Sequence, residues 1–264
     1  MKSRPLNDLV LAEGALAHLF ERLGIDYCCH GEETLEVACI KRGLDVDLVL
    51  AEIEAMRQTR PYSFLHGDLW SEEFLIEYIV ENHHRYFRAT MPVLLEQLTK
   101  VNEVNGERYA YLRPVLFLFQ RVTHEIEQHM RKEEMILFPY IKSLASAHEF
   151  SRRRPLAPFV AIEGPITRMK EEHEETVQIF AKIRALLNDF TTPKDATPMH
   201  AAVIRGLQAF TNDLHQHVHL ENNLLFPRAR ALEQEFDKRT GLPLADRASS
   251  YSREPSHRSA NALS

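Results

Sequence analysis

Two stretches of the sequence share one unusual pattern. Residues 129–139 read HMRKEEMILFP, and residues 217–227 read HVHLENNLLFP. Both follow H-x-x-x-E-x-x-x-L-F-P, so a histidine and a glutamate four positions apart precede the same apolar ending. Side chains at this spacing lie on one face of an α-helix, one turn from each other. The pattern predicts two helices that each present an imidazole and a carboxylate together.

The composition is that of a globular helical protein. The chain has 264 residues, of which 44% are hydrophobic and 27% are charged, and it contains only nine glycines. Apolar residues recur at three- and four-residue spacing over long stretches, which favours an all-α fold. The net charge of −6 provides no basic surface of the kind that binds nucleic acid.

The N-terminus and the cysteines bear on the compartment. The start of the chain lacks the continuous apolar core of a signal peptide, and no run is long enough to cross a membrane. Three cysteines in a chain of this length do not make a disulfide framework, which favours the reducing cytoplasm. The sequence does not fix the oligomeric state, and a dimer is among the states that it allows.

The chain divides into four regions. Residues 1–60 predict a small helical domain, residues 61–70 a linker with Pro61 and Gly67, residues 71–240 a four-helix bundle, and residues 241–264 a disordered polar tail. Gly24 and Gly43 suit helix C-termini, and Asp45 suits an N-cap. The helical segments expected in the small domain are Leu6–Leu23, Glu33–Arg42 and Asp45–Arg57.

The bundle region contains four long periodic segments, separated by stretches that are rich in glycine, proline and polar residues. Pro165 suits the first turn of the third helix, where a missing N–H breaks no hydrogen bond. The four predicted helices are Ser71–Val104, Leu112–Leu144, Pro165–Asp189 and Met199–Gln234.

The two histidine–glutamate pairs interrupt apolar stripes. His129 and Glu133 fill a gap in the apolar face of the second helix, and His217 and Glu221 fill the same kind of gap in the fourth. A single pair of this spacing arises by chance at this composition, and the alternative is an exposed hydrogen-bonded pair. An ionised glutamate on a buried face is costly unless it is paired or bound to metal. Two copies with the same Leu-Phe-Pro ending favour a functional site.

The other two helices supply further candidates. His173 lies near the middle of the apolar stripe of the third helix. His83 and His84 lie on two competing stripes of the first helix, and periodicity does not separate them. Each of these histidines alone is typical of a hydrogen-bonded core residue.

Together these residues predict a metal centre inside the bundle. Four imidazoles and two carboxylates exceed the needs of one tetrahedral zinc. They suit two iron ions, with bridging carboxylates, terminal imidazoles and open positions for a small molecule. Leu225, Phe226 and Pro227 are expected to seal the site and end the helix.

Several nearby residues allow two interpretations. Glu125 and Glu172 either support the ligands and line an entry route, or are solvated helix charges. The histidines expected to be peripheral are His124, His215 and His219. Cys28 and Cys29 allow three interpretations: a redox pair, a metal-binding pair, or two small side chains packed in the core.

The sequence resembles the iron-sulfur cluster repair di-iron proteins (the YtfE/ScdA/DnrN group). GIDYCCHGEETLEVA and LDVDLVLAEIEAM resemble their small N-terminal domain, and HMRKEEMILFPYI, MKEEHEE and HVHLENNLLFPRA resemble their hemerythrin-like domain. The resemblance covers roughly residues 6–235. It implies a hemerythrin-like bundle with two non-haem iron ions, bridged by carboxylates and an oxo group. The ligands that it implies are His84, His129, Glu133, His173, His217 and Glu221.

Two positions refine this resemblance. The segment LIEYIVENHHRYFRATMPVL, compared with the first helix of the family, favours His84 over His83. His30 stands where the family usually has glycine after the cysteine pair, so the resemblance at Cys28 and Cys29 is incomplete. The sequence therefore resembles the family less closely at these cysteines, and at their role in redox chemistry or transfer, than at the metal ligands.

The resemblance implies repair of iron-sulfur clusters damaged by nitric oxide or oxidants, by iron donation, nitric oxide chemistry or both. Iron-sulfur proteins would be the clients, without nucleic acid or membrane. Whether the protein is an enzyme stays open. The main alternative is a module that binds or senses nitric oxide or oxygen without turnover, and a metal-free structural bundle is a third. Val177 stands where oxygen-carrying hemerythrins have another histidine, which argues against reversible oxygen storage.

Overall fold

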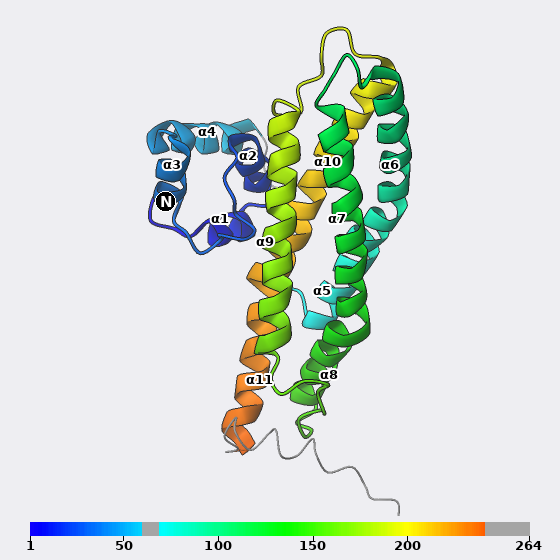
Figure 1. Ribbon diagram of the computed structural model, residues 1–264. Coiled ribbons are helices and arrows are strands. Elements are labelled where there is room, and N and C mark those ends of the chain that lie inside the picture. Colours follow the sequence, from blue (N-terminus) through cyan, green and yellow to red (C-terminus); the bar gives the residue numbers. More distant parts are fainter. Residues whose placement is uncertain (60–68, 241–264) are drawn as a thin grey trace, which may run out of the picture.

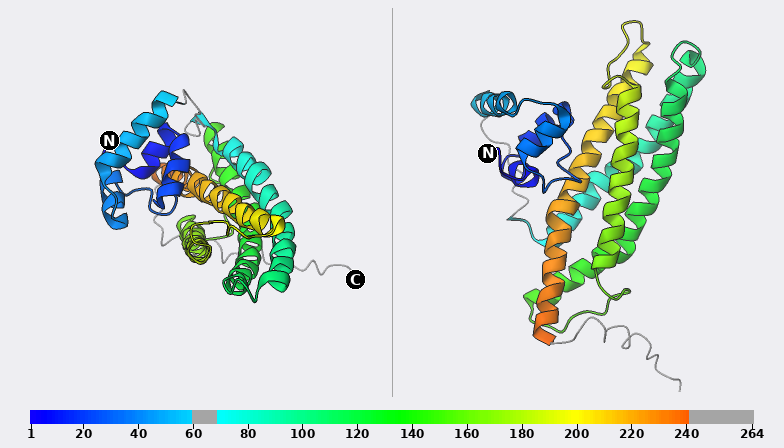
Figure 2. Two further views of the ribbon diagram at one scale, coloured as in Figure 1. Left: turned by 90° about the horizontal axis from the view of Figure 1, so that it is seen from above. Right: turned by 60° about the vertical axis from the view of Figure 1, so that its left-hand side comes forward.

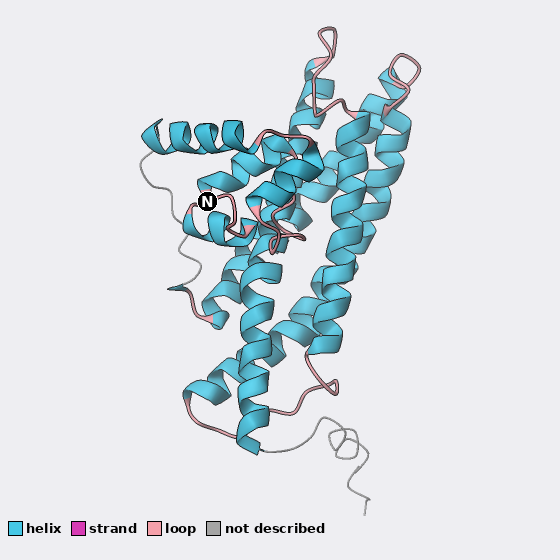
Figure 3. Ribbon diagram, turned by 90° about the vertical axis from the view of Figure 1, so that its left-hand side faces the viewer, coloured by secondary structure: helices cyan, strands magenta, loops and turns pink. Residues whose placement is uncertain are grey.

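The computed structural model describes residues 1–59 and 69–240. These residues form helices and loops (Figure 3), and the only strand-like pairing among them is an isolated bridge between Pro5 and Thr34. The predicted all-α fold is therefore confirmed. Most of the predicted linker, including Pro61 and Gly67, and the whole predicted tail at 241–264 lie outside the described residues.

Four short helices form the N-terminal region (Figure 1). Gly24 and Gly43 adopt a left-handed φ of 66° directly after α2 and α3, as the sequence predicts for helix C-termini. The side chain of Asp45 accepts the N–H of Asp47 at 2.8 Å at the start of α4. The four helices are α1 (Leu6–Ala12), α2 (Ala15–Leu23), α3 (Leu35–Arg42) and α4 (Val46–Thr59).

The prediction of one helix over Leu6–Leu23 is wrong, because the chain leaves the helical conformation at Glu13. This residue has φ −143° and ψ 85°. Its carboxylate accepts a hydrogen bond from Nε of Arg57 in α4 at 3.0 Å. Gly14, which has a low helix propensity, follows. The break thus coincides with a glycine and with an ion pair to a distant helix.

Four long rods make up the bundle and surround a common centre (Figure 2). Three of them contain a short π-helical segment, labelled η2, η3 and η4. The first rod is α5 (Glu72–Tyr78), η2 (Ile79–His84) and α6 (Arg85–Asn105), and the second is α7 (Leu112–Lys132), η3 (Glu133–Leu137) and α8 (Phe138–Glu149). The third is α9 (Glu163–Leu186), and the fourth is α10 (Pro198–Leu220), η4 (Glu221–Leu225) and α11 (Phe226–Thr240).

The Leu-Phe-Pro endings do not stop their helices, which corrects the prediction made for Pro227. The N–H of Phe138 bonds to the carbonyl of Glu133, and that of Phe226 bonds to the carbonyl of Glu221, each five residues back. This wider turn ends one α-helical segment and begins another. Each proline therefore lies in a first turn, where its missing N–H costs little.

The small domain shares its hydrophobic core with the bundle. Phe20, Tyr27 and Ile53 belong to the same cluster of buried side chains as Phe119 and Phe180. In Figures 1 and 2 the small domain lies beside α9 and α10. A second apolar cluster occupies the other end of the bundle and includes residues of α5, α8 and α11. Within residues 1–59 and 69–240, no helix is long and apolar enough to span a bilayer.

Candidate metal centre

Two buried glutamates lie between the two apolar clusters. Glu133 and Glu221 are 0% exposed, and each is the first residue of a π-helical segment. None of their four carboxylate oxygens accepts a well-formed hydrogen bond from the described residues. A buried carboxylate without donors is unfavourable. The two glutamates therefore need positive charge beside them, from protonated imidazoles or from metal ions.

His84 and His217 face one side of these carboxylates. Their Nε2 atoms are 3.1 Å apart. Nε2 of His84 lies 3.5 Å from Oε2 of Glu133, and Nε2 of His217 lies 3.1 Å from Oε1 of Glu221. These four buried residues form one group that can hold a metal ion.

His129 and His173 face the opposite oxygens of the same carboxylates. Nε2 of His129 lies 2.9 Å from Oε1 of Glu133, and Nε2 of His173 lies 3.1 Å from Oε2 of Glu221. These residues form a second group that can hold a metal ion. Each glutamate thus directs one oxygen to each group, as a carboxylate that bridges two metal ions does.

The structure separates the two adjacent histidines that periodicity could not. His84 joins the first group, whereas Nδ1 of His83 lies 3.0 Å from the carboxylate of Asp213. Both rings are buried. They belong to the π-helical segment η2, whose wider turn changes the faces that neighbouring residues occupy.

Glu134 supports His84, although the sequence pattern does not mark it as a candidate. Its Oε1 lies 2.7 Å from Nδ1 of His84 and 2.8 Å from Nη1 of Arg88. The hydrogen bond to His84 lowers the pKa of Glu134 to about 2, with a further contribution from Arg88. An ionised Glu134 keeps the proton of His84 on Nδ1 and leaves Nε2 available to a metal ion.

Glu172 supports His129 through Nδ1, as Glu134 supports His84. Its Oε2 lies 2.9 Å from Nδ1 of His129 and accepts a hydrogen bond from Lys132 at 2.6 Å. Burial alone would raise the pKa of Glu172, but His129 and Lys132 outweigh burial and lower it to about 2. Glu125, the other glutamate considered from the sequence, lies near Arg121 instead, with 2.7 Å between Oε1 and Nε.

Asn222 is the partner of His173. Its Oδ1 lies 3.0 Å from Nδ1 of His173, and its Nδ2 donates to the carbonyl of Cys28 at 3.3 Å. Nδ1 of His217 has no hydrogen-bond partner among the described residues. Three of the four candidate histidine ligands are therefore oriented through Nδ1.

The charge states of two candidate ligands differ. Burial disfavours a charge on His129, but Glu133 and Glu172 outweigh burial and raise the pKa of His129 to about 10. Burial and the neighbouring His84 lower the pKa of His217 well below its usual value. Without metal, protons and carboxylates balance each other in the cluster, so metal uptake would displace protons.

Comparison with known proteins identifies the family. The sequence model described as the hemerythrin HHE cation binding domain matches residues 75–229, and a domain of unknown function, ScdA_N, matches residues 2–57. The iron-sulfur cluster repair protein YtfE of Enterobacter sp. (strain 638) is 32% identical over 232 residues, covering 88% of this chain and 99% of that protein. The protein of the same name from Escherichia coli O81 (strain ED1a) is 31% identical with the same coverage. This chain belongs to the YtfE family. The resemblance inferred from the sequence is confirmed.

All six candidate ligands lie within the segment that matches the hemerythrin HHE domain. The cysteine pair lies within the ScdA_N match. In this member of the YtfE family, Sγ of Cys28 lies 3.9 Å from Sγ of Cys29 and 3.3 Å from Oδ1 of Asp26. Asp26, Cys28 and Cys29 form a third group whose atoms can hold a metal ion. Burial raises the pKa of Cys28 well above its usual value, so this thiol is neutral near pH 7.

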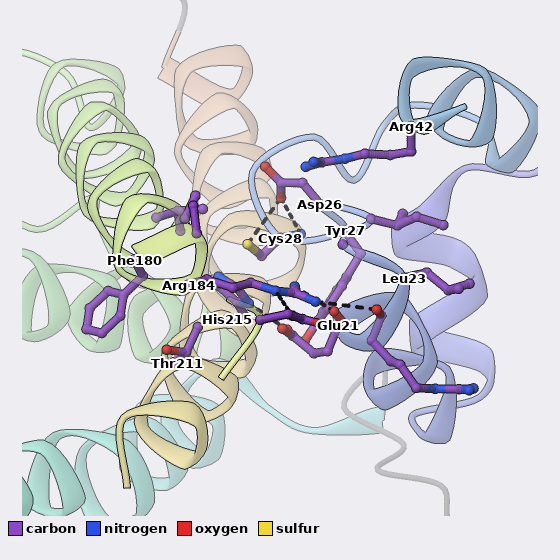
Figure 4. A pocket seen from close by; sticks show the side chains of 17 residues that line it. Glu21, Leu23, Asp26, Tyr27, Cys28, Arg42, Phe180, Arg184, Thr211 and His215 are labelled. Atoms are coloured by element: carbon purple, nitrogen blue, oxygen red, sulfur yellow. Dashed lines mark hydrogen bonds and ion pairs between the residues drawn. The ribbon is translucent and has the colours of Figure 1, made fainter. Parts of the chain in front are cut away.

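A cavity of about 410 Å³ lies between the small domain and helices α9 and α10 (Figure 4). Cys28 lines it. Arg184 of α9 donates to the carbonyl of Glu21 at 2.8 Å, and Nδ1 of His215 lies 2.6 Å from the Glu21 carboxylate. These contacts fasten the C-terminal end of α2 to the bundle.

The histidines expected to be peripheral lie away from the two groups. His124 is exposed, and His215 faces Glu21 as described. His219 is buried, with its ring 5.4 Å from the ring of Tyr27 and its Nδ1 3.0 Å from Nδ2 of Asn223. His215 and His219 thus contact the small domain and not the candidate metal positions.

Proposed function

We propose that this protein holds two iron ions and helps to restore iron-sulfur clusters damaged by nitric oxide or oxidants in the cytoplasm. The observation that carries the proposal is the pair of fully buried carboxylates, each directed at two histidine pairs. Its relatives are named iron-sulfur cluster repair proteins. Iron-sulfur proteins would be the clients.

The donor set fits two iron ions. Each position would have two imidazole nitrogens and two carboxylate oxygens, which suits iron and leaves coordination positions open. His84 and His217 would hold one ion, His129 and His173 the other, with Glu133 and Glu221 bridging both. When bound, the iron ions supply one-electron redox chemistry and sites for a small molecule such as nitric oxide.

The residues around the ligands would determine which ring nitrogen of each imidazole carries the proton. Glu134, Glu172 and Asn222 each accept from Nδ1, so the protonated nitrogen of the ring points away from the metal position. Arg88 holds the carboxylate of Glu134 in place, and Lys132 holds that of Glu172. The contacts of Glu134 and Glu172 would preorganise His84 and His129 before metal enters.

We assign the cysteine pair a role in transfer, reduction or contact with the client. Cys28 and Cys29 lie in the small domain, outside the two histidine groups. The neutral state of Cys28 means that it would have to lose a proton before it bound metal or attacked a disulfide. We therefore assign the holding of the two iron ions to the histidine groups of the bundle and not to the cysteine pair.

The first test is the metal content of the protein purified in air, measured with its visible spectrum. We expect two irons per chain and the near-ultraviolet absorption of a ligand-bridged ferric pair. One zinc per chain, or no metal, would exclude the proposed centre.

The second test is reactivation of an iron-sulfur enzyme that nitric oxide has inactivated. The full-length protein should restore activity, and the Cys28→Ser/Cys29→Ser protein should keep its iron but restore activity more slowly. Cys39→Ser is the matched control, because Cys39 is a buried thiol outside the candidate metal groups. Tight binding of nitric oxide without reactivation would favour the alternative, a sensing module without turnover.

A further inference from the structure

One side chain connects the candidate metal centre to the cysteine loop, which we define as residues 26–31. Asn222 is 4% exposed and follows Glu221 in η4. Its Oδ1 lies 3.0 Å from Nδ1 of His173, and its Nδ2 donates to the carbonyl of Cys28 at 3.3 Å. A single amide group thus touches both a candidate ligand and the cysteine loop.

The next residue provides a comparison. Nδ2 of Asn223 donates to the same Cys28 carbonyl at 3.2 Å and to the carbonyl of Tyr27 at 3.3 Å. Its other contact is the ring of His219, which belongs to neither histidine group. Asn223 therefore fastens the cysteine loop to η4 without touching a candidate ligand.

The orientation of the Asn222 amide depends on the proton of His173. With Nε2 bound to a metal ion, the His173 proton must lie on Nδ1, and the ring donates to Oδ1 of Asn222. The amide then directs its NH₂ group at the Cys28 carbonyl. If the proton lay on Nε2 instead, Nδ1 would be an acceptor and would favour the flipped amide. Two oxygens would then face each other at the loop, and the hydrogen bond to Cys28 would be lost.

We propose that Asn222 is a positioning residue that couples metal occupancy at His129 and His173 to the conformation of the cysteine loop. This inference rests on the proposed function, since it requires a metal ion on Nε2 of His173. Metal binding fixes the His173 tautomer, the tautomer fixes the amide, and the amide holds the loop. The coupling is reciprocal, so displacement of the loop would weaken the metal at this position.

The cysteine loop packs closely against η4 and is held by an internal hydrogen bond. A Cβ at Gly31 would lie 2.8 Å from the carbonyl oxygen of Tyr27 and 2.7 Å from Oδ1 of Asn223, so loop and helix approach closely. Inside the loop, Oδ1 of Asp26 accepts the N–H of Cys29 at 2.9 Å. A change at the Cys28 carbonyl therefore reaches the neighbouring thiol through a short, internally bonded turn.

The test is hydrogen exchange of the loop amides, measured by mass spectrometry in metal-free protein and in protein saturated with ferrous iron. In the wild type, iron should slow exchange of the loop on the order of fivefold, the factor that corresponds to one hydrogen bond. Iron content is measured on the same samples, so that incomplete loading cannot imitate a loss of coupling.

Two variants of Asn222 separate its two contacts. Asn222→Asp keeps an acceptor for His173 but cannot donate to Cys28, so iron should still bind while the slowing of the loop disappears. Asn222→Leu removes both contacts, so the slowing should disappear and iron affinity should fall roughly 10- to 100-fold. The aspartate variant preserves size and keeps the test valid if the leucine variant does not fold.

Asn223→Leu is the matched control. It should speed loop exchange in both states but preserve the ratio between them, with unchanged iron affinity. The coupling would be refuted if iron slowed loop exchange in Asn222→Asp or Asn222→Leu as much as in the wild type. It would also be refuted if iron did not slow loop exchange in the wild type. Either result would leave the proposed function standing. Absence of iron from the wild type would instead refute the proposed function, and this inference with it.

Discussion

Glu133 and Glu221 are the residues that the fold accommodates least easily. Both carboxylates are fully buried, and their oxygens accept no well-formed hydrogen bond from the described chain. Two metal ions would compensate their charge. Replacing either glutamate by alanine should therefore remove both ions, because a bridging carboxylate serves two positions.

Metal content by elemental analysis checks this prediction. His124→Ala is the control, since His124 is exposed and outside both groups. Equal iron content in Glu133→Ala, Glu221→Ala and His124→Ala would show that the buried carboxylates are not ligands.

A second prediction concerns the two neighbouring histidines of the first rod. His84→Ala should deplete iron, because its Nε2 faces His217 and Glu133. His83→Ala should keep iron, because that ring pairs with Asp213. The iron-to-protein ratio of the two purified variants measures the difference, and the opposite order would require a rotated first helix.

Glu134 provides a third prediction at the residue scale. Glu134→Gln should lower iron affinity roughly 10- to 100-fold, because a neutral amide holds the Nδ1–H of His84 less strongly than a carboxylate. Competition with an iron chelator measures the affinity. Glu125→Gln, on the same rod but paired with Arg121, should bind iron like the wild type. Equal affinities in the two variants would mean that Glu134 only fills space.

At the scale of elements, the cysteine loop depends on close packing at Gly31. An added methyl group would meet the Tyr27 carbonyl and Asn223 at less than 3 Å, and backbone cannot move aside as a flexible side chain can. Gly31→Ala should therefore destabilise the protein by about 1–3 kcal/mol and release the loop from η4.

Thermal unfolding and urea denaturation measure that loss. Gly164→Ala is the matched control, because a Cβ there meets nothing within 4 Å. It should lose no stability and should gain up to about 1 kcal/mol, because alanine favours the helical conformation of α9 more than glycine does. Equal stability of the two variants would show that the loop adjusts without cost.

At the scale of the whole molecule, the shared core links the small domain to the bundle. A chain that begins at Trp70 keeps all six candidate ligands and all four rods. It should bind two irons, yet unfold at a temperature lower by at least about 5 °C, because apolar side chains such as Phe180 lose their cover.

Calorimetry and iron analysis on the truncated and full-length proteins test this together. The full-length Cys28→Ser/Cys29→Ser protein separates loss of the thiols from loss of the domain, and it should unfold close to the wild type. Unchanged thermal stability after truncation would show that the shared core contributes little. An empty iron site would mean that the bundle needs the small domain to hold its ligands.

The all-α fold, the four rods and the histidine–glutamate pairs follow from the amino-acid sequence alone. They do so because a helix repeats every 3.6 residues, so His129 with Glu133 and His217 with Glu221 must share a face whatever the rest of the chain does. Gly24, Gly43 and Asp45 marked helix ends for equally local reasons.

Which residues meet across helices depends on how the helices pack against each other. Glu134 and Asn222 look like ordinary polar helix residues, and their contacts with His84 and His173 depend on how separate rods are rotated. The choice between His83 and His84 depends on a wider helical turn, and the contact between Glu13 and Arg57 joins two separate helices. Contacts of this kind join residues far apart in the chain, so no local spacing encodes them.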